Sequence, residues 1–117
     1  IAWFSSPEGN ASVRVIFSTD GGATFGEPVK LDEGKAIGRV DVVMMDADNA
    51  MVSWMEGAEI KAVKVNRDGT KGTSMNIAST SDARSSGFPQ MTKSGNKLIF
   101  AWTDDKEKII KTASVSL

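Results

Sequence analysis

Residues 52–72 read VSWMEGAEIKAVKVNRDGTKG. The stretch opens with an apolar run that ends on Trp54 and turns at the polar residues MEGAE. It continues as the alternating run IKAVKVN into a tight polar loop, NRDGTKG. In the alternating run Ile60 and Ala62 face one way and Val63 faces the other, which is the period of a β-strand. The stretch therefore predicts two β-strands joined by a short turn.

The same pattern occurs three times along the chain. Apolar or small residues ending on Trp recur as IAW, VSW and FAW, and Trp3, Trp54 and Trp102 are spaced by 51 and 48 residues. Each Trp leads into a polar turn and an alternating strand. Asp20 and Asp68, in the loops after the first two of these strands, are also 48 residues apart. The chain is therefore built from an internal repeat.

The repeats predict ten strands and no helix. The middle repeat has four, at residues 39–45, 50–55, 59–65 and 73–78. The first has three, at 1–5, 13–18 and 27–31, and the last has three, near 88–92 and at 97–103 and 109–115. Four-stranded antiparallel units that repeat near 48 residues are typical of β-propeller blades. The predicted fold is all-β: part of one propeller domain, with a partial blade in residues 1–32, a complete blade in 33–80 and a partial blade in 81–117.

Composition narrows the functions that the chain can have. Its 117 residues are 40% hydrophobic and 25% charged, as expected of one folded domain, and the net charge is −1. Basic residues are scattered among acidic ones, so they form no basic stripe that would bind nucleic acid. No apolar run approaches the ~20 residues that span a bilayer. The chain has no Cys, His or Tyr. These absences exclude disulfides, a Ser-His-Asp triad and most zinc catalysis, and no metal or cofactor is expected.

The loop at residues 18–25 reads STDGGATF. Ser18, Asp20, Gly22, Thr24 and Phe25 fill all five positions of the pattern Ser-x-Asp-x-Gly-x-Thr-aromatic, which resembles the Asp box of sialidases. The Asp carboxylate can accept several backbone N–H groups across such a turn, and the aromatic residue is expected to fold back as an apolar plug. Because the loop joins two strands of a repeating unit, the chain resembles the Asp-box (BNR) repeat family of exo-α-sialidase-like and BNR glycosyl hydrolase-like propellers.

The resemblance implies a larger protein. Sialidases have about six blades, so this chain is expected to be a C-terminal fragment of a bacterial, extracytoplasmic protein that is either secreted or periplasmic. Family sialidases use a Tyr nucleophile paired with a Glu, an Asp acid/base and three Arg that hold the sugar carboxylate. Without Tyr the fragment alone is not expected to be an enzyme, whereas the parent is a possible glycoside hydrolase. The resemblance also places the Asp box opposite the active site, where its role is structural.

The predicted topology assigns the charged residues to one or the other face of the propeller. Arg39 and Arg84 both precede the first strand of a repeat, so we expect them on the ligand-binding face, where they would hold a carboxylate. Glu56 and Glu59 fall in a loop on the same face. Asp41 lies within a strand and points either into the channel or toward a neighbouring blade. These five residues are the candidate ligand-binding set, and the catalytic residues are unknown.

Two functions remain open. The first is a glycan-directed, sialidase-like propeller that binds an acidic sugar, and the second is a non-catalytic propeller used for binding or as a scaffold. Trp3, Trp54 and Trp102 are expected to pack between blades rather than to bind sugar. The expected partners are a glycan, the remaining blades of the parent, or further copies of the chain that pair through open blade edges. Nucleic acid and membrane insertion are not expected.

Overall fold

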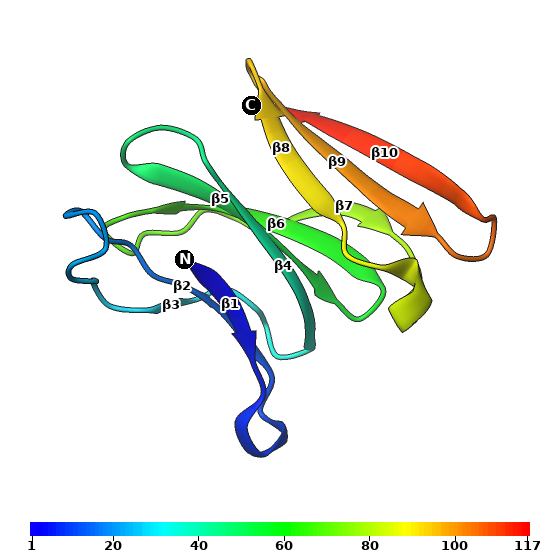
Figure 1. The fold of residues 1–117 in the computed structure, drawn as a ribbon, viewed down its shortest axis with the longest axis horizontal. Helices are drawn as coiled ribbons and strands as arrows, with labels where there is room; N and C mark the ends of the chain where they lie inside the picture. The colour runs from blue at the N-terminus through cyan, green and yellow to red at the C-terminus, as the bar shows by residue number, and fades with distance from the viewer.

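The computed structural model describes all 117 residues and is entirely β apart from two short 3₁₀ turns. Its strands form three antiparallel sheets that lie one after another across the molecule (Figure 1). The first sheet contains β1 (Ala2–Ser5), β2 (Ser12–Val15) and β3 (Val29–Lys30). The middle sheet contains β4 (Ala36–Met44), β5 (Asn49–Glu56), β6 (Glu59–Asn66) and β7 (Met75–Ser79). The last sheet contains β8 (Gln90–Ser94), β9 (Lys97–Asp104) and β10 (Ile109–Ser116).

The predicted all-β class is confirmed, and the three sheets have three, four and three strands. The first sheet differs in detail, because β2 ends at Val15 and β3 has only two residues. Pro28 has no N–H to donate and so delays the start of β3. The 3₁₀ turns η1 (Pro7–Gly9) and η2 (Arg84–Ser86) were not predicted.

Two hydrophobic cores separate the three sheets. The first core lies between the first and middle sheets and includes Val13, Val15 and Trp54. The second lies between the middle and last sheets and includes Ile60 and Phe100. Side chains of β5 and β6 alternate between the two cores, so the middle sheet is covered on both faces, while the outer faces of the first and last sheets are free. The alternation predicted for the stretch after Trp54 is confirmed.

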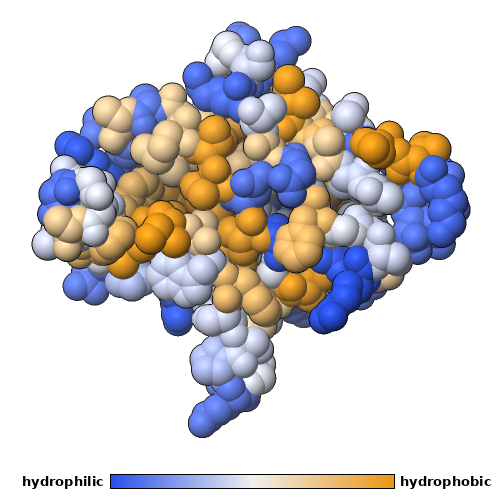
Figure 2. All heavy atoms as spheres, viewed as in Figure 1, coloured by the Kyte–Doolittle hydropathy of each residue, from blue (hydrophilic) through white to orange (hydrophobic).

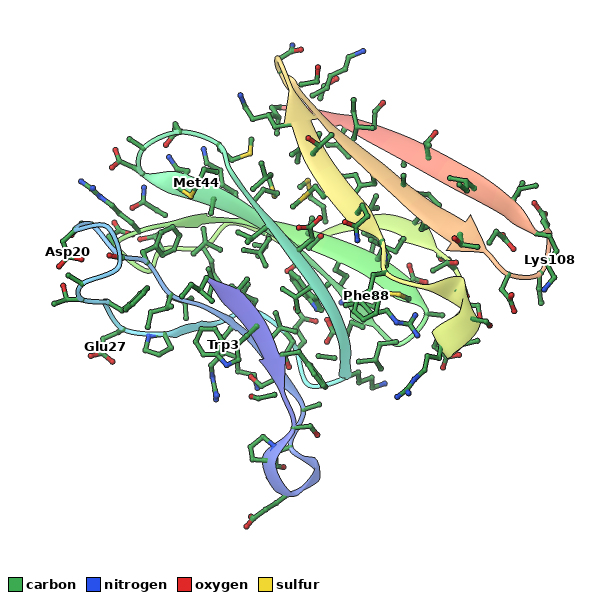
Figure 3. The ribbon with its side chains drawn as sticks, viewed as in Figure 1. Trp3, Asp20, Glu27, Met44, Phe88 and Lys108 are labelled. Atoms are coloured by element: carbon green, nitrogen blue, oxygen red, sulfur yellow. The ribbon has the colours of Figure 1, made fainter.

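The strand connections divide the molecule into two ends. At one end, which we call the Asp-box end, Arg67 in the β6–β7 turn binds Asp48 in the β4–β5 turn, with Nε 2.9 Å from a carboxylate oxygen. The opposite end, the pocket end, contains the β5–β6 turn, whose Gly57 N–H donates to the carbonyl of Lys35. Asp20 and Phe88 mark the two ends and lie far apart in Figure 3.

Candidate functional site

A pocket of about 740 Å³ opens at the pocket end, between β1, the start of β4 and the connection from β7 to β8. Its lining mixes charged and apolar side chains: Ala2, Trp3, Phe4, Ile37, Gly38, Arg39, Val40, Asp82, Arg84 and Phe88. Figure 2 shows apolar residues gathered across the centre of the face presented in Figure 1, with hydrophilic residues among them and at the rim. A pocket with guanidinium groups and aromatic rings suits a ligand that has an anionic group and an apolar surface.

Arg39 lies in the pocket wall in a left-handed backbone conformation, with φ 58°. The register of β4 against β5 is interrupted between Gly38 and Asp41, so Arg39 lies in a β-bulge. A bulge re-aims a side chain, and here the guanidinium turns toward the β7–β8 connection. A left-handed conformation is strained for a residue with a Cβ, and such strain concentrates at functional sites.

The guanidinium of Arg39 is already engaged by the protein. Its Nη2 donates to the carbonyl oxygens of Asp82 and Ala83 at 3.0 and 2.9 Å, and its Nη1 lies 3.2 Å from Met55 Sδ. These contacts fasten the β7–β8 connection to β4. Nη2 of Arg39 is thus committed to two backbone oxygens, and the role of Arg39 in holding a carboxylate stays a prediction.

Gly38 allows β1 to approach β4 beside the pocket. Its φ is 94°, and a Cβ at this position would lie 3.1 Å from Cγ of Phe4. Both the backbone conformation and the space favour glycine. Gly38 and Arg39 together shape the wall against which Phe4 packs.

Arg84 is the free guanidinium of the pocket. It begins the 3₁₀ turn η2, is exposed, and its side chain makes no hydrogen bond or ion pair. Phe88, four residues later, is 64% exposed and lines the same pocket. The structure thus brings both predicted arginines to one pocket, with Arg39 holding the connection that carries Arg84.

Asp41 is occupied within the protein. One carboxylate oxygen accepts the Met91 N–H of β8 at 2.8 Å, and the other accepts the N–H of Val42, also at 2.8 Å. Of the two orientations expected for Asp41, the structure has the one toward the neighbouring sheet. Asp41 fastens the last sheet to the middle one and does not line the pocket, and its role in ligand binding stays a prediction.

Glu56 is also occupied, at the centre of a buried cluster. One carboxylate oxygen accepts the N–H of Glu33 at 3.0 Å, and the other accepts the Trp54 indole N–H at 3.2 Å and lies 3.3 Å from Lys61 Nζ. Burial by itself would raise the pKa of Glu56, but the hydrogen bonds from Glu33, Trp54, Lys61 and Lys35 outweigh it and lower the pKa. Glu56 holds the connection between the first two sheets and does not line the pocket.

Two other acidic residues of the pocket end have partners as well. Glu59 accepts the Ser79 hydroxyl at 2.7 Å, and Asp104 lies 2.7 Å from Lys111 Nζ. Glu59 likewise does not line the pocket. Asp82 is the carboxylate that does line it, beside Arg84. Sequence reasoning missed Asp82 and Phe88, which lie in the connection from β7 to β8, and Phe4, whose place beside the pocket depends on the packing of β1 against β4.

The Asp-box loop is held together by its own side chains at the opposite end of the molecule. Asp20 accepts hydrogen bonds from the Ser18 hydroxyl at 2.8 Å, the Thr24 N–H at 2.9 Å and the Thr24 hydroxyl, and the Ser18 oxygen accepts the Gly22 N–H at 2.8 Å. This closed set of bonds agrees with a structural role for the loop. Phe25 remains 45% exposed and is not the buried plug that the motif predicted.

Asp20 gives a pH-dependent prediction. Hydrogen bonds from the Thr24 hydroxyl and N–H and from Ser18 lower its pKa from 3.8 to about 2. Because the folded pKa is the lower one, the loop is stabilised above pH ~4 and loses this contribution as the pH falls toward 2. We expect the Asp20 carboxyl carbon to titrate near pH 2 by NMR and to shift upward in Thr24→Ala. A normal midpoint in the wild-type chain would contradict the hydrogen-bonded loop.

Comparisons of the chain with family models, with curated proteins and with solved structures find no match. No helix in the structure has the length and apolar character needed to cross a membrane. No group of three or more acidic side chains is arranged to hold a metal ion.

Proposed function

We propose that the chain is a segment of a sialidase-like β-propeller whose pocket binds an acidic sugar, in a protein that acts outside the cytoplasm. The observation that carries the proposal is the pocket beside β4, where the free guanidinium of Arg84 lies among aromatic side chains. A guanidinium binds a carboxylate through two parallel hydrogen bonds, and sugar rings pack their apolar faces on aromatic side chains.

Two features of the chain support the propeller arrangement. Three antiparallel sheets follow one another with a core between each pair, as successive blades do. The Asp-box loop lies at the end opposite the pocket, which is the arrangement that the resemblance to sialidases implies. The proposed location outside the cytoplasm depends on the same resemblance.

Binding without catalysis is the second candidate, and the state of the carboxylates favours it for this chain. Glycoside hydrolysis needs two carboxyl groups facing the scissile bond, or a Tyr in place of one of them. Asp41 and Glu56 are both held by backbone N–H groups, and the chain has no Tyr. Within this segment the pocket therefore supports recognition of an acidic ligand, and any catalytic pair would come from other segments of a larger propeller.

The proposal predicts that Arg84→Ala weakens binding of N-acetylneuraminic acid by roughly tenfold or more, as expected for the loss of a charged hydrogen-bonding group. Isothermal titration calorimetry measures the change, with N-acetylglucosamine as the uncharged control ligand. Arg67→Ala is the matched control variant, because Arg67 is an exposed arginine at the Asp-box end. Equal effects of the two substitutions, or equal binding of the two sugars, would contradict the proposed site.

A further inference from the structure

The connection from β7 to β8 is attached to the rest of the molecule mainly through side chains. Residues 81–89 of this connection, which we call the strap, form the yellow-green turn between the two strands in Figure 1. No backbone–backbone hydrogen bond joins the strap to the rest of the chain. Arg39 donates to two of its carbonyl oxygens on one side, and the Ser85 hydroxyl donates to Asp105 of the β9–β10 turn at 2.9 Å on the other. These two anchors hold the strap in place.

The corresponding connection between the first and middle sheets is fastened from inside. Glu56 follows Trp54 by two residues and accepts its indole N–H. The same carboxylate also accepts the backbone N–H groups of Glu33 and Lys35 in the β3–β4 connection. One buried carboxylate thus joins that connection to the tryptophan of its sheet.

The strap lacks this internal fastening. Asp104 follows Trp102 by two residues, but one of its carboxylate oxygens accepts the Glu107 N–H at 3.0 Å and the other lies 2.7 Å from Lys111 Nζ. The Trp102 indole N–H is buried and has no hydrogen-bond partner. The carboxylate that could join the last sheet to the strap is therefore turned away from both.

The strap also buries polar groups that have no partner. They are the hydroxyls of Ser86 and of Thr80, which directly precedes the strap. Ser86 belongs to η2, which contacts β9, and Gln90 pairs with Ala101, which places the neighbouring Trp102 opposite the end of the strap. Each hydroxyl oxygen and the indole nitrogen has less than 1 Å² of accessible surface, so a water molecule has no room beside it. Such groups are rare in folded proteins and oppose the conformation that buries them.

We propose that the strap moves between a closed position, which the structure shows, and an open one, and that Arg39 is the residue that holds it closed. In the open position both anchors are released, and the Trp102 indole N–H reaches water. The strap carries Arg84 to the pocket, so opening removes this guanidinium from the ligand. This last consequence rests on the proposed function, in which Arg39 is a positioning residue that acts through Arg84.

The contributions for and against closure are of similar size. The hydrogen bonds from the Arg39 guanidinium and from Ser85 favour the closed position, and a charged donor makes the stronger bonds. The unsatisfied hydroxyls and the unsatisfied indole N–H oppose it by comparable amounts. Neither position is therefore favoured so strongly that the other is unpopulated.

Exchange of the tryptophan indole N–H groups with deuterium, followed by NMR, tests the strap in the whole chain. Trp54 is the internal control, because its indole is also buried but is hydrogen-bonded. We expect the Trp102 indole to exchange at least about tenfold faster than that of Trp54. Arg39→Ala should speed the exchange of Trp102 by roughly tenfold more, through the loss of a charged donor, and leave Trp54 unchanged. Alanine keeps a Cβ at the left-handed position, so the substitution removes the guanidinium without relieving the backbone.

Ser86→Ala should act in the opposite direction. It removes a buried hydroxyl that has no partner, so it should favour the closed position and slow the exchange of Trp102 by about fivefold or more. A side chain that merely supports the structure would not give slower exchange when it is shortened. Arg67→Ala, at the Asp-box end, is the matched control for Arg39→Ala and should leave both tryptophans unchanged. Circular dichroism checks that every variant is folded.

N-acetylneuraminic acid separates the strap from the proposed function. A ligand held by Arg84 favours the closed position, so at ~100 times its dissociation constant it should slow the exchange of Trp102 about a hundredfold. If the sugar has no effect while the variants behave as expected, the proposed ligand is wrong and the strap stands. The strap is overturned if Trp102 and Trp54 exchange alike in the wild type, if Arg39→Ala changes both equally, or if Ser86→Ala does not slow Trp102.

Discussion

Replacing Glu56 with Ala is expected to destabilise the chain by about 3–5 kcal/mol, which is the usual cost of removing one member of a buried ion pair. Glu56 is 7% exposed and lies 3.3 Å from Lys61 Nζ. Without the carboxylate, Lys61 would keep a half-buried charge whose remaining partner is Glu33 at 3.9 Å. The Glu33 N–H and the Trp54 indole N–H would also lose their acceptor, and unsatisfied buried donors add to the cost.

Chemical denaturation followed by tryptophan fluorescence measures this loss. Glu56→Gln should cost less than Glu56→Ala, because its amide oxygen can still accept one of the N–H groups. Glu59→Ala is the control, since Glu59 accepts one exposed hydroxyl and its loss should change stability by less than about 1 kcal/mol. Similar effects of Glu56→Ala and Glu59→Ala would show that the buried cluster contributes little.

The lowered pKa of Glu56 also predicts how the stability of the chain depends on pH. The pKa of folded Glu56 is lowered, so its contribution is present above the pKa of the unfolded chain and is lost as the pH falls through the lowered value. The wild type should therefore lose stability in acid more steeply than Glu56→Gln does. Parallel acid-unfolding curves for the two proteins would contradict a charged Glu56 in the folded state.

Because of the internal repeat, most of the strands could be predicted from the sequence. Alternating apolar residues around Trp54 and Trp102 indicated both the strands and the two directions in which their side chains point, and the two cores follow that alternation. The strand ends were less predictable. Pro28 and the side-chain hydrogen bonds of the Asp-box loop shorten β2 and β3. These local interactions compete with strand pairing but do not change the hydrophobic periodicity of the sequence.

The candidate site was only partly predictable. Topology correctly brought Arg39 and Arg84 to one end of the molecule, but it could not show whether a charged side chain faces solvent or a backbone group. Arg39 turns onto two carbonyls because of a bulge, Asp41 accepts an N–H group from β8, and Glu56 accepts N–H groups from the β3–β4 connection. Hydrophobic spacing does not indicate these partners, which lie 21 to 50 positions away in the sequence.

The three tryptophans provide a comparison that separates burial from sequence pattern. Trp54→Ala is expected to destabilise the chain by about 3–5 kcal/mol, the usual cost of removing a large aromatic side chain from a core. Trp54 is 1% exposed, packs in the first core and donates its indole N–H to Glu56.

Trp3→Ala removes the same side chain from the same position of the repeat, but from the first sheet, where Trp3 is only partly buried. We expect this substitution to cost less than half as much, because less apolar area returns to water. Chemical denaturation followed by circular dichroism measures both losses, since each variant still has two other tryptophans but a different fluorescence signal. Equal losses for the two substitutions would mean that Trp3 is as well packed as Trp54, and position in the repeat rather than burial would then determine the cost.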